Sequence, residues 1–101
     1  MYLTQLLLPL PGGRKARASR KSFGEIRDEL VEKFGGVTAY VHSPAEGDWV
    51  NGGRRDRDTV VVIEVMTKKR ERRWWRSYRK ALEARLAQEY VIARTTEISL
   101  N

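Results

Sequence analysis

The sequence predicts an α+β domain in which one four-stranded antiparallel sheet carries two helices on one of its faces. Two observations support this fold class. Strand-like and helix-like segments follow one another in the order strand, helix, strand, strand, helix, strand, and they account for all 101 residues. This βαββαβ order defines the ferredoxin-like, or split βαβ, arrangement. A chain of this length is expected to contain one domain, so residues 1–101 are predicted to fold as a single unit.

The first strand and the first helix have the clearest boundaries. Tyr2–Leu10 is a mainly apolar run that stops at a Pro-Gly-Gly turn, which predicts a strand. Arg14–Lys21 is basic and polar, and we expect it to be a loop. The helix is expected to start at Ser22, because Ser22 and Glu25 match a capping box, and to end before a Gly-Gly pair. Its apolar stripe consists of Phe23, Ile26, Leu30, Val31 and Phe34.

The second half of the chain predicts a hairpin, a helix and a last strand. Val37–Ser43 alternates in polarity, and Thr59–Met66 is almost entirely β-branched, so both are predicted to be strands. Pro44–Asp58 is long for a hairpin connection, and we expect either strand extensions or a flap there. A second helix is expected to begin near Lys69, and Tyr90–Leu100 is expected to form the last strand. The apolar stripe of this helix consists of Trp75, Tyr78, Leu82 and Leu86, with Trp74 and Ala81 beside it.

Composition excludes several kinds of chemistry. The chain has no cysteine, which removes disulfides, thiolate metal ligands and a cysteine nucleophile. It has one histidine and no closely spaced carboxylate pair, so we expect no metal and no cofactor. The apolar run at Met1–Leu10 is too short to span a membrane and lacks the basic region of a signal peptide. We therefore expect a cytoplasmic protein without a membrane partner, whose net charge of +7 favours anionic partners.

The third strand is apolar on both faces, and this predicts a partner for the sheet. Val61, Ile63 and Val65 alternate with Val60, Val62 and Met66. Two helices cover one face of such a sheet, whereas a solvated second face would be polar. Apolar patches of this size on a soluble protein usually mark an interface. We therefore expect a homodimer joined through the open sheet face.

Glu64 is a carboxylate inside this apolar strand, and it is the main candidate site residue. A buried acid requires a partner or a shifted pKa, as general acids and bases do. Tyr40, Gln5 and Arg94 lie on neighbouring strands and are predicted to line a small polar pocket with Glu64. The structural alternative is that Glu64 forms a salt bridge with Arg94, or with the symmetry-related Arg94, as part of the dimer interface. The strand register, which decides whether Gln5, Glu64 and Arg94 meet, is left open.

His42 and Trp49 are predicted to lie near the mouth of that pocket. A histidine beside an acid can transfer protons. His42, however, is expected at the end of its strand and away from Glu64, where a hydrogen-bonded surface histidine is the structural alternative. The catalytic residues, if the protein is an enzyme, are therefore left open.

Two basic segments predict an alternative function in nucleic-acid binding. Lys68–Lys80 interleaves basic and aromatic residues, and such a pattern suits phosphates and bases. The structural alternative is a solvated helix whose aromatic residues face the core and whose basic residues pair with acids of the first helix. The candidate nucleic-acid contacts are Arg14, Lys15, Arg17, Arg20, Lys21, Arg72, Arg73 and Arg76.

In its order of elements and its doubly apolar sheet, the chain resembles the ferredoxin-like dimeric α/β-barrel group. The segments FGGVTAYVHSPAEGDW and WWRSYRKALEARLAQE are also similar to those of small uncharacterised bacterial proteins of this layout. The resemblance implies a sheet-to-sheet dimer and, in many members, an enclosed pocket. We therefore expect a homodimer that binds a small organic or anionic ligand. A cofactor-independent monooxygenase-like enzyme, which the resemblance also implies, and nucleic-acid binding are the alternatives.

Overall fold

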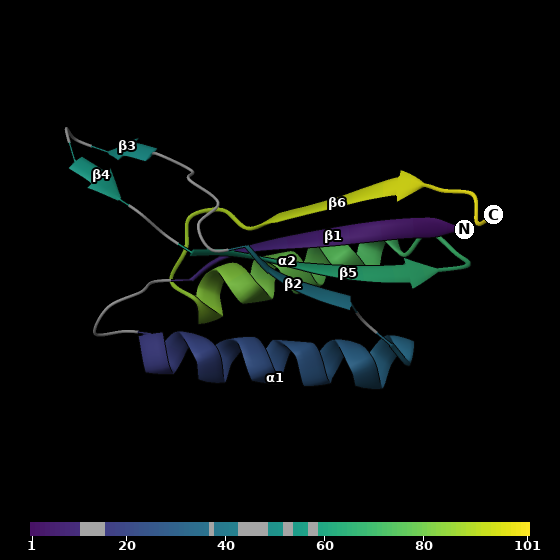
Figure 1. Ribbon diagram of the computed structural model, residues 1–101, viewed down its shortest axis with the longest axis horizontal. Coiled ribbons are helices and arrows are strands. Elements are labelled where there is room, and N and C mark those ends of the chain that lie inside the picture. The colour runs from purple at the N-terminus through teal and green to yellow at the C-terminus, as the bar shows by residue number, and fades with distance from the viewer. Residues whose placement is uncertain (11–15, 37, 43–48, 52–53, 57–58) are drawn as a thin grey trace.

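The computed structural model describes residues 1–10, 16–36, 38–42, 49–51, 54–56 and 59–101. Its elements in chain order are β1 (Tyr2–Leu10), α1 (Ala16–Phe34), β2 (Thr38–His42), β3 (Trp49–Asn51), β4 (Arg54–Asp56), β5 (Thr59–Thr67), α2 (Arg72–Arg85) and β6 (Ile92–Glu97). The predicted α+β class, with two helices and an antiparallel sheet, is confirmed (Figure 1).

The main sheet is built around β1. Its strand order is β2-β5-β1-β6, and every neighbouring pair is antiparallel. β1 lies between β5 and β6 along most of its length, so residues far apart in the chain meet on either side of it (Figure 1). At the middle of the strand, Gln5 is paired in register with Glu64 on β5 and with Arg94 on β6. This register brings three predicted site residues into one row.

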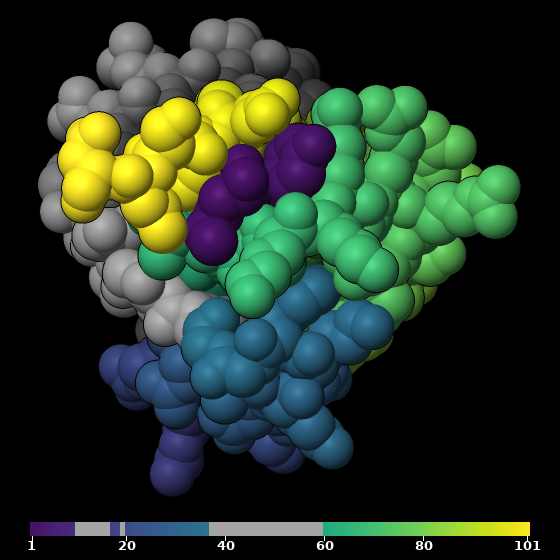
Figure 2. Space-filling model, turned by 90° about the vertical axis from the view of Figure 1, so that its right-hand side faces the viewer, coloured from purple at the N-terminus to yellow at the C-terminus, as the bar shows by residue number. Residues whose placement is uncertain are grey.

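The hydrophobic core lies between one face of the sheet and the two helices. Viewed along the long axis, the ends of β6, β1 and β5 lie side by side, with α1 beneath them (Figure 2). Alternation along each strand sends every second side chain into this layer. The core comprises Leu6, Leu8, Ile26, Leu30, Val61, Ile63, Val65, Trp75, Leu82 and Val91.

Aromatic side chains close the core between the helices. Phe34 of α1 stacks on Trp75 at 5.3 Å between ring centroids and meets Trp74 edge-on at 5.0 Å. Trp74 stacks in turn on Tyr78 at 4.8 Å. Such pairs contribute about 0.5–1.5 kcal/mol each beyond the area they bury. The predicted apolar stripes are therefore confirmed for most members, but Val31 and Ala81 are exposed.

The first helix begins earlier than its capping pattern predicts. α1 starts at Ala16, so the expected loop is wrong for residues 16–21, and Ser22 and Glu25 lie inside the helix. The reason is helix propensity: alanine, arginine and lysine favour helix, and the segment contains no glycine or proline. Arg14 and Lys15 lie outside the described residues.

The long connection before β5 contains two strands that the predicted order lacks. β3 and β4 pair with each other in a separate two-stranded sheet, rather than extending the main one. The described residues therefore form eight elements, where six were expected. The remaining boundaries differ slightly from expectation, since α2 begins at Arg72 and β6 spans Ile92–Glu97.

Candidate functional site

Gln5, Glu64 and Arg94 form a hydrogen-bonded polar chain across three strands. The Gln5 side-chain amide donates from Nε2 to Glu64 Oε2 at 2.8 Å. The same side chain accepts, through Oε1, a hydrogen bond from Arg94 Nε at 2.8 Å. The three side chains, whose meeting the sequence left open, therefore lie in one row. Gln5 stands between Glu64 and Arg94, in place of the direct salt bridge that was the structural alternative.

The polar chain lies on the face of the sheet opposite the helices. Alternation places it in one layer with Leu3, Leu7 and Val62, which are partly exposed. Met66 and Ile92 in the same layer are 53% and 40% exposed. The described part of the chain therefore has an open face that is apolar around one charged and hydrogen-bonded row.

The other residues predicted around Glu64 are known only by their backbone positions. Tyr40 is paired in register with Val62, and His42 is paired with Val60. Trp49 lies on β3, in the separate two-stranded sheet. The side chains of these three residues lie outside the described structure, so their role at a ligand site stays a prediction.

The two basic segments proposed to contact nucleic acid lie at opposite ends of the molecule. Arg17, Arg20 and Lys21 are exposed on the first turns of α1. Arg72 begins α2, and Figure 1 shows that this helix starts at the other end of the long axis. The molecule is 42 Å long. The starts of the two described basic segments therefore lie far apart along the molecule.

The aromatic residues of Lys68–Lys80 serve the core. Trp75 is buried, and Trp74 and Tyr78 pack against the core as partly buried side chains. A surface that binds single-stranded nucleic acid by stacking needs exposed aromatic faces. The interleaved pattern thus reflects helix-to-helix packing, as the structural alternative predicts.

An ion-pair cluster does join the two helices, but its arginine lies outside Lys68–Lys80, and no described basic residue of that segment forms the expected salt bridge with an acid of α1. Arg85 of α2 donates to Glu29 of α1 at 2.8 Å and lies 3.9 Å from Glu25. The Arg85 hydrogen bond is the largest influence on Glu29 and, against partial burial, lowers its pKa. Tyr78 also donates its hydroxyl proton to Glu29, and burial together with this carboxylate raises the tyrosine pKa.

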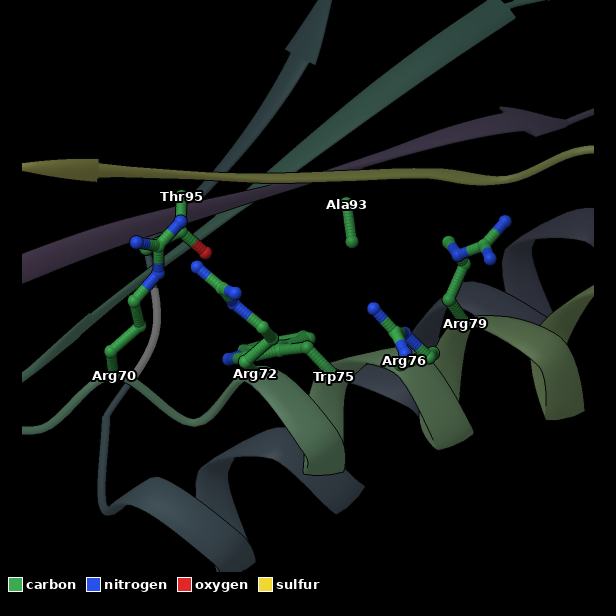
Figure 3. A pocket seen from close by; sticks show the side chains of 7 residues that line it. All are labelled: Arg70, Arg72, Trp75, Arg76, Arg79, Ala93 and Thr95. Carbon is green, nitrogen blue, oxygen red and sulfur yellow. The ribbon is translucent and has the colours of Figure 1, made fainter.

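A pocket of about 260 Å³ between α2 and β6 is the site that sequence reasoning missed. Its lining consists of Arg70, Arg72, Trp75, Arg76, Arg79, Ala93 and Thr95. In Figure 3, Arg72 and Arg76 rise from α2 toward β6, and Arg70 reaches in from the preceding loop. The Thr95 hydroxyl faces the Arg72 guanidinium from the sheet side. The lining contains four positive charges and no acid.

The positive charge of this pocket is only partly balanced by acidic side chains. Arg79 has an acidic partner, Glu83, at 3.2 Å, and lies over the Tyr90 ring at 5.0 Å. Among the described residues, Arg70, Arg72 and Arg76 have no acidic group within 4 Å. The buried Trp75 side chain also lacks a hydrogen-bond partner for its indole Nε1.

A sequence signal for this pocket does exist. Arg72, Arg76 and Arg79 are spaced i, i+4 and i+7, which places them along one side of a helix. Arg73 falls outside that row and does not line the pocket. The spacing alone could not show which element faces the row, because that depends on how α2 packs against β6.

The described part of the chain lacks two further features, a metal-binding cluster and a membrane-spanning helix. No group of three or more histidine, aspartate and glutamate side chains there could hold a metal ion. Neither described helix is long and apolar enough to cross a lipid bilayer. Comparison with protein-family models, curated proteins and solved structures finds no match.

Proposed function

We propose that this protein binds a small oxyanion, such as a phosphate or a phosphorylated or carboxylated metabolite, in the arginine pocket between α2 and β6. The observation that carries the proposal is the convergence of Arg70, Arg72 and Arg76 on one cavity without an acidic partner among the described residues. Like charges in a shared cavity repel one another. A bound anion would remove that cost.

The side-chain chemistry matches such a ligand. Guanidinium groups present a planar fork of donors that binds phosphate or carboxylate through two parallel hydrogen bonds. Thr95 can add a neutral donor: its hydroxyl lies 2.8 Å from the Thr4 hydroxyl, so Thr4 can donate to Thr95 while Thr95 donates to the ligand. At about 260 Å³ the pocket is slightly below the usual range for drug-sized ligands, which favours a compact anion.

Two observations favour a small anion over nucleic acid. The aromatic residues of Lys68–Lys80 are packed in the core, and the basic ends of α1 and α2 are far apart. The Glu64 site is a weaker candidate, because Gln5 and Arg94 already supply its polar chain from within the protein. The monooxygenase-like alternative rests on the resemblance alone.

The test is thermal unfolding in the presence of pyrophosphate at constant ionic strength. A ligand that binds only the folded state raises its stability by about 2.7 kcal/mol at one hundred times its Kd. We expect a saturable rise in Tm for the wild-type protein and its loss in Arg72→Gln and Arg76→Gln. Arg73→Gln removes an equal charge from the same helix outside the pocket, so it should keep the full rise.

Two results would contradict the proposal. An equal loss in Arg73→Gln would show that net charge alone attracts the anion. Retardation of single-stranded RNA that depends on Arg17 and Arg20 as strongly as on Arg76 would favour the nucleic-acid alternative. That binding would also weaken steeply as salt increases.

We also propose that the fold is ferredoxin-like and that the protein acts as a homodimer joined through the open sheet face. The strand order β2-β5-β1-β6 supports the first part, with β3 and β4 as an insertion into the middle hairpin. The exposure of Met66 and Ile92 supports the second part. Light scattering at low and high salt tests it: a salt-independent mass of two chains is expected, and a monomer at every concentration would contradict it.

A further inference from the structure

The polar chain on the open face carries opposite charges at its two ends. Glu64 lies one strand to one side of β1, and Arg94 lies one strand to the other side. Neighbouring strands are about 4.8 Å apart, so the two charged residues are separated by about 10 Å across the sheet. Gln5 stands between them and hydrogen-bonds to both.

A symmetric dimer must use this patch on both copies, and symmetry leaves two simple arrangements. In a two-fold dimer each contact occurs twice: when a residue of one copy faces a second residue of the partner, the second residue of that copy faces the first of the partner. A two-fold axis that runs along β1 above Gln5 reverses the sheet from side to side and places Glu64 opposite the partner subunit's Arg94. An axis that runs across the strands keeps the sides in place and sets like charges opposite each other.

We infer that a second copy of this chain docks on the open face with the two-fold axis along β1, so that two Glu64–Arg94 pairs cross the interface. This inference rests on the homodimer proposed above and adds its orientation. Charge complementarity selects this arrangement, because like charges opposed in a desolvated interface are strongly unfavourable.

The dimensions of the open face fit this arrangement. Packed sheets lie about 10 Å apart, a gap that a glutamate and an arginine reaching from opposite sides can bridge. The angle between aligned sheets is about 30°, so the axis follows β1 only approximately. Leu3, Leu7 and Met66 would be covered at the same time, so that two charged pairs would cross a mainly apolar interface.

The two orientations predict opposite changes in the dimer Kd for two substitutions that each remove a charge. Glu64→Gln and Arg94→Gln each remove one charge from the row. If opposite charges face each other, each substitution leaves an unpaired charge and is expected to raise the dimer Kd about tenfold or more. If like charges face each other, each substitution relieves repulsion and lowers the Kd. Sedimentation equilibrium measures the change, with Arg73→Gln on α2 as the matched control.

A mixing experiment separates contacts between copies from the hydrogen bonds within one copy. Glu64→Arg has two positive ends and Arg94→Glu has two negative ends, so each variant alone is expected to be monomeric. Mixed in equal amounts, they are expected to form a heterodimer. If a variant were monomeric only because the hydrogen bonds within its own polar chain are lost, adding the other variant would not restore dimerisation.

The outcomes also separate this inference from the proposed homodimer. A wild-type protein that is monomeric at every concentration overturns both. A wild-type dimer whose Kd is lowered or unchanged by the neutral variants keeps the homodimer and overturns the crossed pairing. Circular dichroism of each variant confirms folding, and the neutral variants give a decision even where a charge-reversed variant does not fold.

Discussion

The two faces of the central sheet differ in the kind of polar side chains that they carry. On the helix-covered face, Thr4 is the buried polar residue of the described chain, and its hydroxyl pairs with that of Thr95. On the open face, Gln5, Glu64 and Arg94 form a longer chain that carries two charges. Small neutral groups suit a sealed core, whereas long charged groups suit a surface that can meet another molecule. The difference indicates that the helix-covered face packs the core and opens at the pocket between α2 and β6, whereas the other face carries its polar groups on an open surface.

The largest expected effect compares two adjacent leucines of β1. Leu6 is fully buried under the helices, whereas Leu7 points to the open face and is partly exposed. Leu6→Ala is expected to lower the free energy of unfolding by about 3 kcal/mol through lost burial and an unfilled cavity. Leu7→Ala should cost about 1 kcal/mol or less within a single chain. Urea unfolding measures the difference in the free energy of unfolding, under conditions where both variants have the same oligomeric state. Equal losses of stability would show that the chain itself covers the open face.

An intermediate effect is expected at the hydroxyl pair of the covered face. Thr4→Val leaves the Thr95 hydroxyl without its protein partner, which is expected to cost about 1–2 kcal/mol. Replacing both threonines by valine removes both hydroxyls together and should restore most of that loss. A double-mutant cycle in urea measures the coupling energy. Additive losses would mean that the hydrogen bond contributes nothing to the stability of this face.

The smallest expected change in stability concerns the ion pair of Arg85 and Glu29 between the two helices. Arg85 lowers the pKa of Glu29 below the ordinary value of 4.5, so the folded state favours the ionised carboxylate. The stability from this pair is therefore present above about pH 4.5 and is lost as pH falls through the lowered pKa. Because Glu29 is 42% exposed, solvent screening limits the contribution to below about 1 kcal/mol.

Glu29→Gln tests this small contribution. The variant should be slightly less stable than the wild type near neutral pH, and the difference should shrink on acidification. Urea unfolding at a series of pH values between 3 and 7 gives both curves. A difference that grows as pH falls would contradict the assigned direction of the pKa.

Local pattern predicted the central part of the molecule well. Alternation in Thr59–Met66 separates Val61 from Val62 onto opposite faces, and the structure buries the first and leaves the second partly exposed. The same alternation, combined with the strand order, made Gln5, Glu64 and Arg94 candidates for one pocket, while the register that decides whether they meet was left open. These results depend on periodicity and topology, which a sequence carries directly.

The errors concern features that local pattern does not determine. Ser22 and Glu25 match a capping box, but the basic segment before them also favours helix, so α1 continues back to Ala16. The pairing of β3 with β4 is an exception, because Gly52-Gly53 alone separate these strands in the sequence and such a two-residue spacing is itself a hairpin signal. The arginine pocket depends on the distance between α2 and β6, and no spacing within Lys68–Lys80 contains that information.

The most direct test of the central claim is an NMR titration of the labelled protein with pyrophosphate at constant ionic strength. Saturable chemical-shift changes are expected for the Trp75 indole N–H, the pocket arginine Nε–H groups and the backbone amides of Ala93 and Thr95. The chemical shifts of the Gln5 side-chain amide, which lies on the open face, should not change. Shifts spread evenly over all arginines, or none at the Trp75 indole up to high concentration, would contradict an oxyanion site between α2 and β6.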